Sequence, residues 1–411
     1  MQAENNKNNI KTLSMGCRLN ALESEKIQNM LAGHIEAAII VNTCAVTAEA
    51  ERQSGQTIRR TARENPNAPV FVTGCAATRN PGLFSEIPNA IVIDNRDKMR
   101  LAAYIEGLAK APCASTSPSI TQFTSNDGRL SKQFIQVQNG CNHACAYCVT
   151  RLLRGPSVSF DYNDILTDAK RAVQNGFYEI VLTGVDTASY AKSGILISDL
   201  CKKLLNDVPE IRRLRLSSID PASPEIFKLI DLMHDDARMM PHFHLSMQSG
   251  SDTILRAMGR RHNAETVRRI VRAAGNDITF SWDIICGFPG ETDELFAETQ
   301  KLAAELRPIR IHAFPFSPRP GTPAADMHPQ INRAISKQRV HEIMAVANTS
   351  CVEFMQSKLG AIVQVLVEEN NIGRTPHDIP VKIDGAIIPA RTICNIEILD
   401  MTDGCFIGHA V

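Results

Sequence analysis

Residues 133–148 read QFIQVQNGCNHACAYC, a strand-like run that ends in three closely spaced cysteines. Cys141, Cys145 and Cys148 form a C-x3-C-x2-C array on one tight loop. Three thiolates can ligate three irons of a [4Fe–4S] cluster and leave the fourth iron open. An open iron can chelate the amino and carboxylate groups of S-adenosylmethionine (SAM), so that an electron from the cluster yields a 5′-deoxyadenosyl radical. The array therefore predicts a SAM-cleaving cluster.

A structural zinc loop is the alternative for this array. Zinc sites generally use four ligands, arranged as C-x2-C pairs or with histidine. His143 lies inside the loop, but no second cysteine pair is nearby. The loop also follows a predicted barrel strand at its carboxyl end, where such folds place their sites, and this position favours the cluster.

Outward from the loop, the chain alternates strand-like runs with helical patterns. The runs QFIQVQ, EIVLTG, IRRLRLSS, HFHLSMQ, ITFSWDIIC and IRIHAFPF are each, except the last, followed by helical periodicity. One helical stretch, AETVRRIVRAA, follows an Asn263 N-cap and places its apolar residues on one face. Six βα units predict an open, partial (βα)6 barrel over residues 132–350.

The rest of the chain predicts two further domains around this barrel. Residues 1–110 alternate KTLSMG, AAIIVNT, PVFVTG and AIVIDN with helical patterns, which is typical of a doubly wound parallel α/β domain. A Ser-, Thr- and Pro-rich stretch at 111–131 predicts a linker. One long helix is expected over 333–356, and 357–411 predicts a small all-β domain. The fold class is α/β.

A second set of cysteines follows three predicted strands of the N-terminal domain. Cys17, Cys44 and Cys75 come just after KTLSMG, AAIIVNT and PVFVTG. Because the carboxyl ends of parallel strands share one edge of a sheet, these thiols should meet in space. A single cysteine there would be explained as an inert buried thiol, but three equivalent positions predict a second three-thiolate cluster. We interpret the other six cysteines as packing or linker residues.

Further candidates lie at strand ends of the predicted barrel, in LTGVD, LSSID, LSMQSG and DIICGFPGE. Ordinary turn chemistry explains each motif alone, because Gly and Ser mark turns everywhere. Tyr147 lies within the cysteine loop, and Arg261 lies in a turn that could aim a guanidinium fork at phosphate or carboxylate. The expected SAM or substrate contacts are Tyr147, Gly184, Ser217, Gln248, Ser249, Arg261, Asp283 and Gly287.

Charge and hydropathy constrain compartment and partners. The chain has 44 Lys+Arg and 44 Asp+Glu, so a nucleic-acid surface would require local segregation of charge. Arginines concentrate between Leu255 and Arg272, whereas the tail 357–411 holds four basic against seven acidic residues. Neither a signal peptide nor an apolar run of membrane-spanning length is recognisable. We expect a cytoplasmic protein without a membrane partner, whose twelve cysteines favour metal or catalytic roles.

Taken together, these motifs resemble the methylthiotransferases of the radical-SAM superfamily over essentially the whole chain. Three types exist in that family: the MiaB type acts on isopentenyladenosine in tRNA, the RimO type on an aspartate of a ribosomal protein, and the MtaB type on N6-threonylcarbamoyladenosine in tRNA. The segments GCRLN at 16–20, LTGVDTASY, LRLSSIDP and PHFHLSMQSGSDTILRAMGRRH are most similar to the MtaB type. The tail resembles a TRAM domain.

This resemblance implies a specific activity. Cys17, Cys44 and Cys75 would bind an auxiliary [4Fe–4S] cluster that delivers sulfur, and the 141–148 loop would bind the cluster that cleaves SAM. The expected reaction adds a methylthio group to C2 of N6-threonylcarbamoyladenosine at position 37, beside the anticodon. A second SAM would methylate the sulfur. Expected partners are the tRNA anticodon loop, a flavodoxin-like or ferredoxin-like electron donor, and a sulfur donor.

Three alternatives remain open. The same chemistry could act on isopentenyladenosine tRNA or on a ribosomal protein. An electron-transfer or sensor protein would use its clusters only for redox and would not cleave SAM. An RNA-binding protein with structural zinc would be colourless.

Overall fold

The computed structural model describes residues 9–110 and 131–411, which form two compact units, each treated by itself below. Within the described residues, the first unit comprises 9–110, 140–143 and 148–156, and the second comprises 131–139, 144–147 and 157–411. Except for Ser131, the predicted linker at 111–131 lies outside the described residues, as does Cys113.

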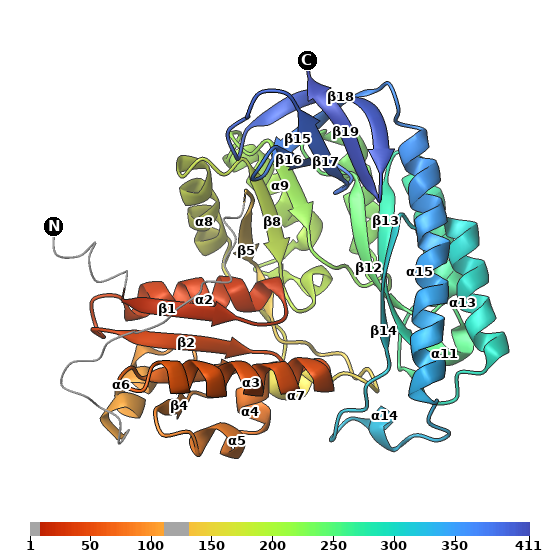
Figure 1. Cartoon of the computed structure of the whole chain (residues 1–411). Helices are drawn as coiled ribbons and strands as arrows, with labels where there is room; N and C mark the ends of the chain where they lie inside the picture. Colours follow the sequence, from red (N-terminus) through yellow and green to blue (C-terminus); the bar gives the residue numbers. More distant parts are fainter. Residues whose placement is uncertain (1–8, 111–130) are drawn as a thin grey trace. The chain divides into compact units, whose positions relative to one another are not determined.

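The first unit is built on a parallel sheet with strand order β1-β2-β3-β4 (Figure 1). Successive residues of its fully buried strand β2 face opposite sides: Ile39 and Val41 pack in one core with α3, and Ala38 and Ile40 in another with α2. Helices on both faces confirm the predicted parallel α/β domain. Its elements are β1 (Ile10–Ser14), α2 (Arg18–Leu31), β2 (Ala38–Thr43), α3 (Ala48–Glu64), β3 (Val70–Gly74), α4 (Cys75–Arg79), α5 (Gly82–Ser85), β4 (Ala90–Val92), α6 (Leu101–Lys110) and α7 (Thr150–Arg154).

The second unit contains the predicted partial barrel. Two parallel sheets, β11-β8-β5 and β12-β13-β14, are joined by the isolated bridges Leu214↔Met239 and Ile219↔Leu245. In the described residues this gives a row of six parallel strands, as expected. The main elements are β5 (Gln133–Gln136), α8 (Tyr162–Gln174), β8 (Glu179–Thr183), α9 (Ile197–Asp207), β11 (Arg213–Leu216), α10 (Glu225–Asp235), β12 (His242–Gln248), α11 (Asp252–Ala257), α12 (Ala264–Ala274), β13 (Thr279–Cys286), α13 (Asp293–Leu306) and β14 (Arg310–Pro315).

The predicted cap of α12 is present, because the Asn263 side chain accepts a hydrogen bond from the Thr266 amide at 2.8 Å.

Short elements complete the second unit. They are β6 (Gln138–Asn139), β7 (Val158–Ser159), η1 (Thr187–Ser189), β9 (Ala191–Lys192), β10 (Ile195–Leu196) and α14 (Pro323–Asp326).

The two faces of the barrel strands differ in chemistry. On β13, Trp282 and Ile284 belong to the large apolar core, and on β12, Phe243 and Leu245 do the same. Because side chains alternate along a strand, residues such as Asp283 point to the opposite face, into the lumen. The lumen side of these strands is therefore polar.

A long helix, α15 (Arg333–Gln356), precedes the C-terminal domain and has the predicted bounds. Its buried Ile343 and Ala347 pack on the barrel core, and its Met355 packs in the core of the last domain. Among the helices of residues 9–110 and 131–411, none combines the length and the apolar character needed to cross a membrane.

The C-terminal domain is a small closed β-barrel, as the sequence predicts. Its strands follow the order β15-β16-β17-β19-β18 around an apolar core that includes Val381, Ile396 and Phe406. The strands are β15 (Ile362–Val367), β16 (Ile372–Arg374), β17 (Pro380–Asp384), β18 (Ile393–Thr402) and β19 (Cys405–Ala410).

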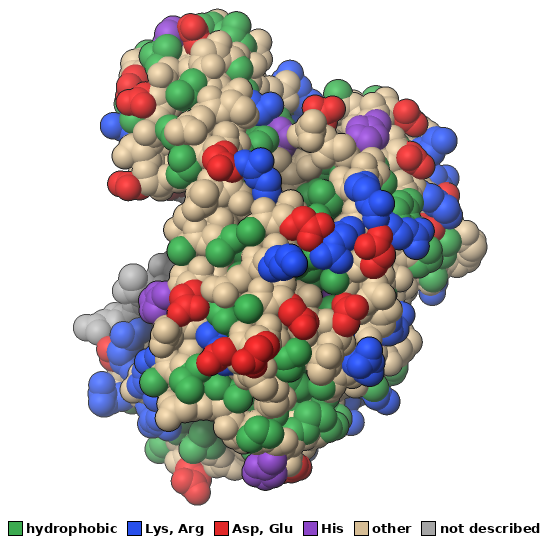
Figure 2. Space-filling model, turned by 90° about the vertical axis from the view of Figure 1, so that its right-hand side faces the viewer, with side chains coloured by type: hydrophobic (Ala, Val, Ile, Leu, Met, Phe, Trp, Pro, Cys, Tyr) green, Lys and Arg blue, Asp and Glu red, His purple; other side chains and the backbone are tan. Residues whose placement is uncertain are grey.

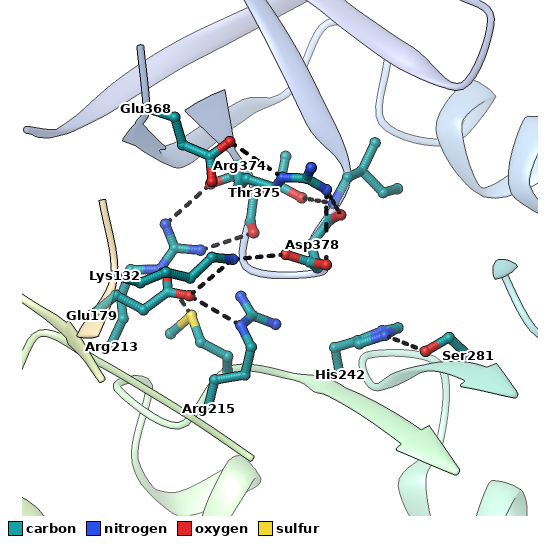
Figure 3. Close-up of polar contacts among 12 residues, drawn as sticks. Lys132, Glu179, Arg213, Arg215, His242, Ser281, Glu368, Arg374, Thr375 and Asp378 are labelled. Atoms are coloured by element: carbon teal, nitrogen blue, oxygen red, sulfur yellow. Dashed lines mark hydrogen bonds and ion pairs between the residues drawn. The ribbon is translucent and has the colours of Figure 1, made fainter. Parts of the chain in front are cut away.

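A buried ionic network joins this small barrel to the amino ends of the larger barrel's strands (Figure 3). Arg213 pairs with Glu179 at 2.9 Å and donates to the carbonyl of Thr375 at 2.8 Å. Asp378 accepts a hydrogen bond from Lys132 at 3.2 Å. Burial raises the pKa of Glu179, but the nearby cations outweigh it and hold that pKa at about 2. The carboxylate is thus ionised inside the protein.

Candidate functional site

The three strand-end cysteines of the first unit lie at the same edge of its sheet, after the adjacent parallel strands β1, β2 and β3. Cys17 is the N-cap of α2, Cys44 follows β2, and Cys75 is the first residue of α4. Cys44 and Cys75 are buried and Cys17 is exposed. Burial raises the pKa of Cys44 to about 11, and Cys17 and Cys75 add smaller contributions in the same direction, so the three thiols lie in one region of the unit. Their role as cluster ligands stays a prediction.

Local backbone geometry explains this convergence. Gly16 and Gly74 both have left-handed φ angles, of 84° and 93°, which glycine adopts readily. A Cβ at Gly16 would lie only 2.5 Å from Cys44 Sγ. The side-chain amide of Asn20 also donates to the carbonyls of Met15 and Thr43, at 2.8 and 3.0 Å. The loops that carry Cys17 and Cys44 are thus tied together.

The chemistry of these donors fits an iron–sulfur cluster. Thiolates, not thiols, bind metal, so a site that raises thiol pKa values needs a metal cation to deprotonate them. Burial also raises the pKa of Cys75, partly offset by Arg154 and Lys98. Three thiols, one of them exposed, on the edge of a parallel sheet match a cluster that a substrate can approach.

Arg154 is a neighbour of this site that was not among the predicted site residues. Its side chain is 3% exposed, donates to Glu23 Oε1 at 2.8 Å and to Asn20 Oδ1 at 2.7 Å, and hydrogen-bonds to Cys75. Lys98, equally buried, pairs with the other oxygen of Glu23. Burial raises the pKa of Glu23, but Lys98 and Arg154 together lower it by more, so the pKa lies below its usual value. The cysteines therefore sit beside a buried cation. The ion pairs of Arg154 and Lys98 with Glu23 could not be predicted locally, since the three residues are far apart along the chain.

The cysteine loop at 141–148 is held by several backbone contacts. In the first unit, the Cys141 amide donates to the Gly155 carbonyl at 3.1 Å. In the second unit, the Ala146 amide donates to the Met258 carbonyl, and the Ala146 carbonyl accepts from Ala324, both at 2.9 Å. All three cysteines are partly buried. A loop fixed in this way suits a cluster that must keep one iron open, and the ligand assignment remains a prediction.

An arginine lies directly against this loop. Arg260, after α11, donates to Cys145 Sγ at 3.5 Å, to the Ser246 carbonyl at 2.8 Å and to Asp220 at 3.0 Å. Burial opposes its charge, but Tyr147, Asp220 and Cys145 together raise the pKa of Arg260. In this turn Arg260, rather than its neighbour Arg261, contacts the cysteine, and binding of phosphate or carboxylate by the turn stays a prediction.

The neighbouring candidates Arg261 and Tyr147 flank this arginine. Arg261 has a side chain that is 54% exposed and pairs with Asp220 at 3.1 Å. Tyr147 packs against an apolar cluster that includes Met258 and Phe288. Both residues lie near the loop, and a role for either in SAM binding stays a prediction.

Two predicted glycines and a serine are positioned by close packing. A Cβ on Gly184 would lie 2.9 Å from Gln138 Oε1, and one on Gly287 would lie 1.9 Å from Ser336 Oγ. The Ser217 hydroxyl hydrogen-bonds to that of Thr187 at 2.8 Å. These strand ends are tightly built, which accounts for the two glycines without a ligand.

The end of β12 is the most unusual of the predicted strand ends. Gln248 has a left-handed φ of 72°, and the register of β12 against β13 shifts just before it. Such backbone is uncommon for a residue other than glycine and concentrates at functional sites. The Ser249 hydroxyl is instead buried against the Thr299 hydroxyl and the Ser251 amide. A contact of either Gln248 or Ser249 with SAM or substrate stays a prediction.

Two histidines of the lumen were not predicted. The Asp283 carboxylate, which was predicted, lies 3.0 Å from His244 Nε2 and 3.8 Å from His312 Nδ1. The signal was available in HFHLSMQ and IRIHAFPF, whose alternation places these histidines on one face of each strand with the other polar residues. Because apolar residues alternate with these histidines on the opposite face, both runs were interpreted only as strands.

Four arginines of the segment 255–272 are paired with acidic side chains. Figure 2 shows basic and acidic side chains interspersed on the face bordered by α13 and α15. On α12, Arg268 pairs with Glu305 at 2.7 Å, and Arg272 pairs with Glu265. Surface pairs of this kind neutralise each other locally.

Comparisons with known proteins agree with this geometry. Residues 135–303 match the radical SAM superfamily, and residues 9–94 match the family described as uncharacterized protein family UPF0004. The chain is 40% identical over 395 residues to the threonylcarbamoyladenosine tRNA methylthiotransferase MtaB of Rickettsia prowazekii, covering 92% of each chain. It is 32% identical to the MtaB of Thermotoga maritima, covering 87% of this chain and 86% of that protein.

A more distant relative and a solved structure extend the comparison. The tRNA-2-methylthio-N(6)-dimethylallyladenosine synthase of Erythrobacter litoralis is 30% identical, over 91% of each chain. The radical SAM methyltransferase TsrM of Kitasatospora setae superposes with a TM-score of 0.53 at 17% identity, over 73% of this chain and 68% of that one, a likeness of fold alone. The first relative combines high coverage with the highest identity of these matches. The chain belongs to the radical-SAM methylthiotransferase family, within its MtaB group.

Proposed function

We propose that this protein is a tRNA methylthiotransferase that adds a methylthio group to C2 of N6-threonylcarbamoyladenosine at tRNA position 37. The observation that carries the proposal is the pairing of two separate three-cysteine sets with 40% identity, over 92% of the chain, to an MtaB protein. A purely redox role leaves the strand-end motifs of the barrel without a purpose, and structural zinc generally uses four ligands, whereas each set offers three cysteines.

Each cysteine set has its own task in this proposal. Cys141, Cys145 and Cys148 would hold the cluster, which with SAM bound would supply radical chemistry for the inert C2–H bond. Cys17, Cys44 and Cys75 would hold the auxiliary cluster, which would be the source of sulfur. Arg260, which touches Cys145 and the end of β12, ties this cysteine to the barrel strand. Arg154 provides positive charge beside Cys75.

The choice of substrate rests on the relatives. The MtaB proteins match at up to 40% identity, whereas the dimethylallyladenosine enzyme of Erythrobacter litoralis matches at 30%. Both groups modify an adenosine in tRNA according to their names, and they differ in the substituent on N6. The base must leave the anticodon stack to reach a protein pocket.

The proposed reaction needs further partners. A flavodoxin-like or ferredoxin-like protein would supply electrons to the clusters, and a sulfur donor would replace the sulfur lost in each turnover. We place the reaction in the cytoplasm, where tRNA is modified. The C-terminal barrel has an acidic balance, with four basic and seven acidic residues from 357 to 411, so RNA contacts must come also from other surfaces.

Mass spectrometry of tRNA nucleosides from cells with and without the gene tests this function. The methylthio derivative of threonylcarbamoyladenosine should disappear on deletion and return with the wild-type gene, but not with a Cys145→Ala gene. Persistence of that nucleoside after deletion, in a host without a second such enzyme, would overturn the substrate assignment.

A further inference from the structure

The lumen of the large barrel contains a polar layer on its β12–β14 side. His244 lies on β12, Ser281 and Asp283 on β13, and His312 on β14. In the registers of the parallel pairs, His244 is level with Ser281, and Asp283 is level with His312. Three adjacent, rigid strands thus present two imidazoles and a carboxylate to one small region. The ligand atoms of the two histidines and Asp283 all lie within 4.8 Å of one another.

Most hydrogen-bonding groups of this layer are already committed. Ser281 Oγ lies 2.8 Å from His244 Nδ1 and 2.9 Å from His242 Nε2. A hydroxyl carries one hydrogen and a carboxylate only accepts. One arrangement that satisfies all of these contacts has His242 donating to Ser281, Ser281 donating to His244, and His244 Nε2 donating to Asp283 at 3.0 Å. His242 Nδ1 extends this series of hydrogen bonds to Thr279 Oγ1 at 2.8 Å. His244 and one carboxylate oxygen are fixed in place.

Two groups are left to face the lumen. Asp283 Oδ1 lies 3.8 Å from His312 Nδ1, which is too long for a hydrogen bond. Within the described residues, His312 has no hydrogen bond, and its side chain is 46% exposed. The layer therefore offers an acceptor on Asp283 and a donor on His312, side by side.

One side chain connects β12, which carries His244, to Cys145. Arg260 bridges Cys145 Sγ and the carbonyl of Ser246, which is two residues beyond His244 on the same strand. Two strand residues correspond to roughly 6–7 Å, about the width of a nucleobase. On adenine, the C2–H bond and the N6 substituent point in different directions. A base that presents C2 to the loop therefore sends its N6 substituent away from the loop.

We propose that His312 and Asp283 read the threonylcarbamoyl group on N6 of the target adenosine, with His312 donating to its carboxylate and Asp283 accepting from its hydroxyl or N–H. The inference rests on the proposed function, and it names the residues that select the N6 substituent of the target adenosine. A dimethylallyl group offers neither partner and would bury both protein groups unsatisfied, which disfavours it strongly. His244 and Ser281 hold Asp283 in position.

Binding of anticodon stem-loop RNAs tests this assignment without depending on turnover. Three RNAs carry threonylcarbamoyladenosine, dimethylallyladenosine or unmodified adenosine at the same position, and fluorescence anisotropy reports Kd for the reconstituted protein. The wild type should bind the threonylcarbamoyl RNA at least about tenfold more tightly than either other RNA. His312→Phe should remove that preference, and His312→Gln, which keeps a neutral donor, should retain part of it. His341→Phe, at an exposed histidine on α15, is the matched control and should change nothing.

The outcomes separate the two proposals. If wild type methylthiolates threonylcarbamoyl tRNA but His312→Phe keeps the full binding preference, the recognition assignment is wrong and the function stands. If wild type methylthiolates only the dimethylallyl RNA, the proposed function itself fails. Loss of the preference on treatment with a chelator that leaves cluster absorbance intact would show that these residues bind a metal ion and would overturn direct recognition.

Discussion

Arg154 donates from Nη1 to Oε1 of Glu23 at 2.8 Å, and both side chains are almost completely buried. This bond joins the segment after the cysteine loop to α2, the helix that begins next to Cys17. Lys98 occupies the second oxygen of Glu23, so one carboxylate faces two buried cations. The position of the cation beside Cys75 thus depends on a single acidic residue.

Glu23→Gln should therefore destabilise the first unit severely. The substitution leaves Arg154 and Lys98 buried without a counter-charge, which typically costs about 3–5 kcal/mol. Urea unfolding followed by circular dichroism measures the loss. Glu25→Gln, at an exposed position of the same helix, should stay within about 0.5 kcal/mol of wild type. Equal effects of the two variants would refute the role given to Glu23.

Iron content tests the assignment of the two cysteine sets. Anaerobically reconstituted wild type should hold about eight irons per chain, and Cys17→Ala about four, because two [4Fe–4S] clusters are expected. Cys394→Ala, in the C-terminal barrel, should keep about eight. A wild-type value of about four, unchanged in Cys17→Ala, would eliminate the auxiliary cluster.

Arg213 should be critical for attaching the C-terminal barrel. Arg213→Met leaves the carbonyls of Arg374 and Thr375 without their donor and removes a fully buried partner of Glu179. We expect a loss of about 3–5 kcal/mol and faster proteolysis after residue 356. Arg212→Met changes the exposed neighbour and should have little effect. Wild-type proteolysis of the Arg213 variant would contradict this account.

The same attachment should weaken in mild acid. Burial lowers the pKa of His377 to about 4, although Nδ1 hydrogen-bonds to the Pro241 carbonyl at 3.1 Å. The folded protein keeps this histidine neutral, whereas the unfolded chain takes up a proton below about pH 6.5. Stability should therefore fall as the pH drops from 6.5 to 4, with His377 contributing on the order of 3 kcal/mol.

His377→Gln isolates that contribution. The charged groups that face His377 are Lys358, Arg215 and Asp277, and they remain in the variant. Thermal melts between pH 4 and 7 should show a flatter stability curve for His377→Gln than for wild type. His341→Gln serves as the exposed control. Parallel curves for wild type and His377→Gln would show that this group does not titrate on unfolding.

The sequence was sufficient for the architecture because the relevant signals are local. Alternation of strand-like and helical patterns marked the parallel domain and the partial barrel, and the helix at 333–356 has the predicted bounds. The Asn263 cap lies next to the apolar stripe of its helix. The strand-end positions of Cys17, Cys44 and Cys75 also follow from topology alone, since parallel strands share one carboxyl edge.

Features that depend on distant pairs could not be predicted in this way. Arg154 and Glu23 are 131 residues apart, and Arg213 and Thr375 are 162 apart. Nothing in the local sequence distinguishes these arginines from solvated ones. The lumen histidines could be predicted only in part. Their alternation along each strand is a local signal, but their convergence on Asp283 depends on the register of three strands.

Reconstituted activity on matched RNAs tests the central claim most directly. Purified protein with both clusters, SAM and a reductant is incubated with stem-loops carrying threonylcarbamoyladenosine or dimethylallyladenosine, and the nucleosides are analysed by mass spectrometry. We predict the methylthio product from the threonylcarbamoyl RNA alone, and none with Cys145→Ala. A methylthio product from the dimethylallyl RNA, with the threonylcarbamoyl RNA unchanged, would contradict the account.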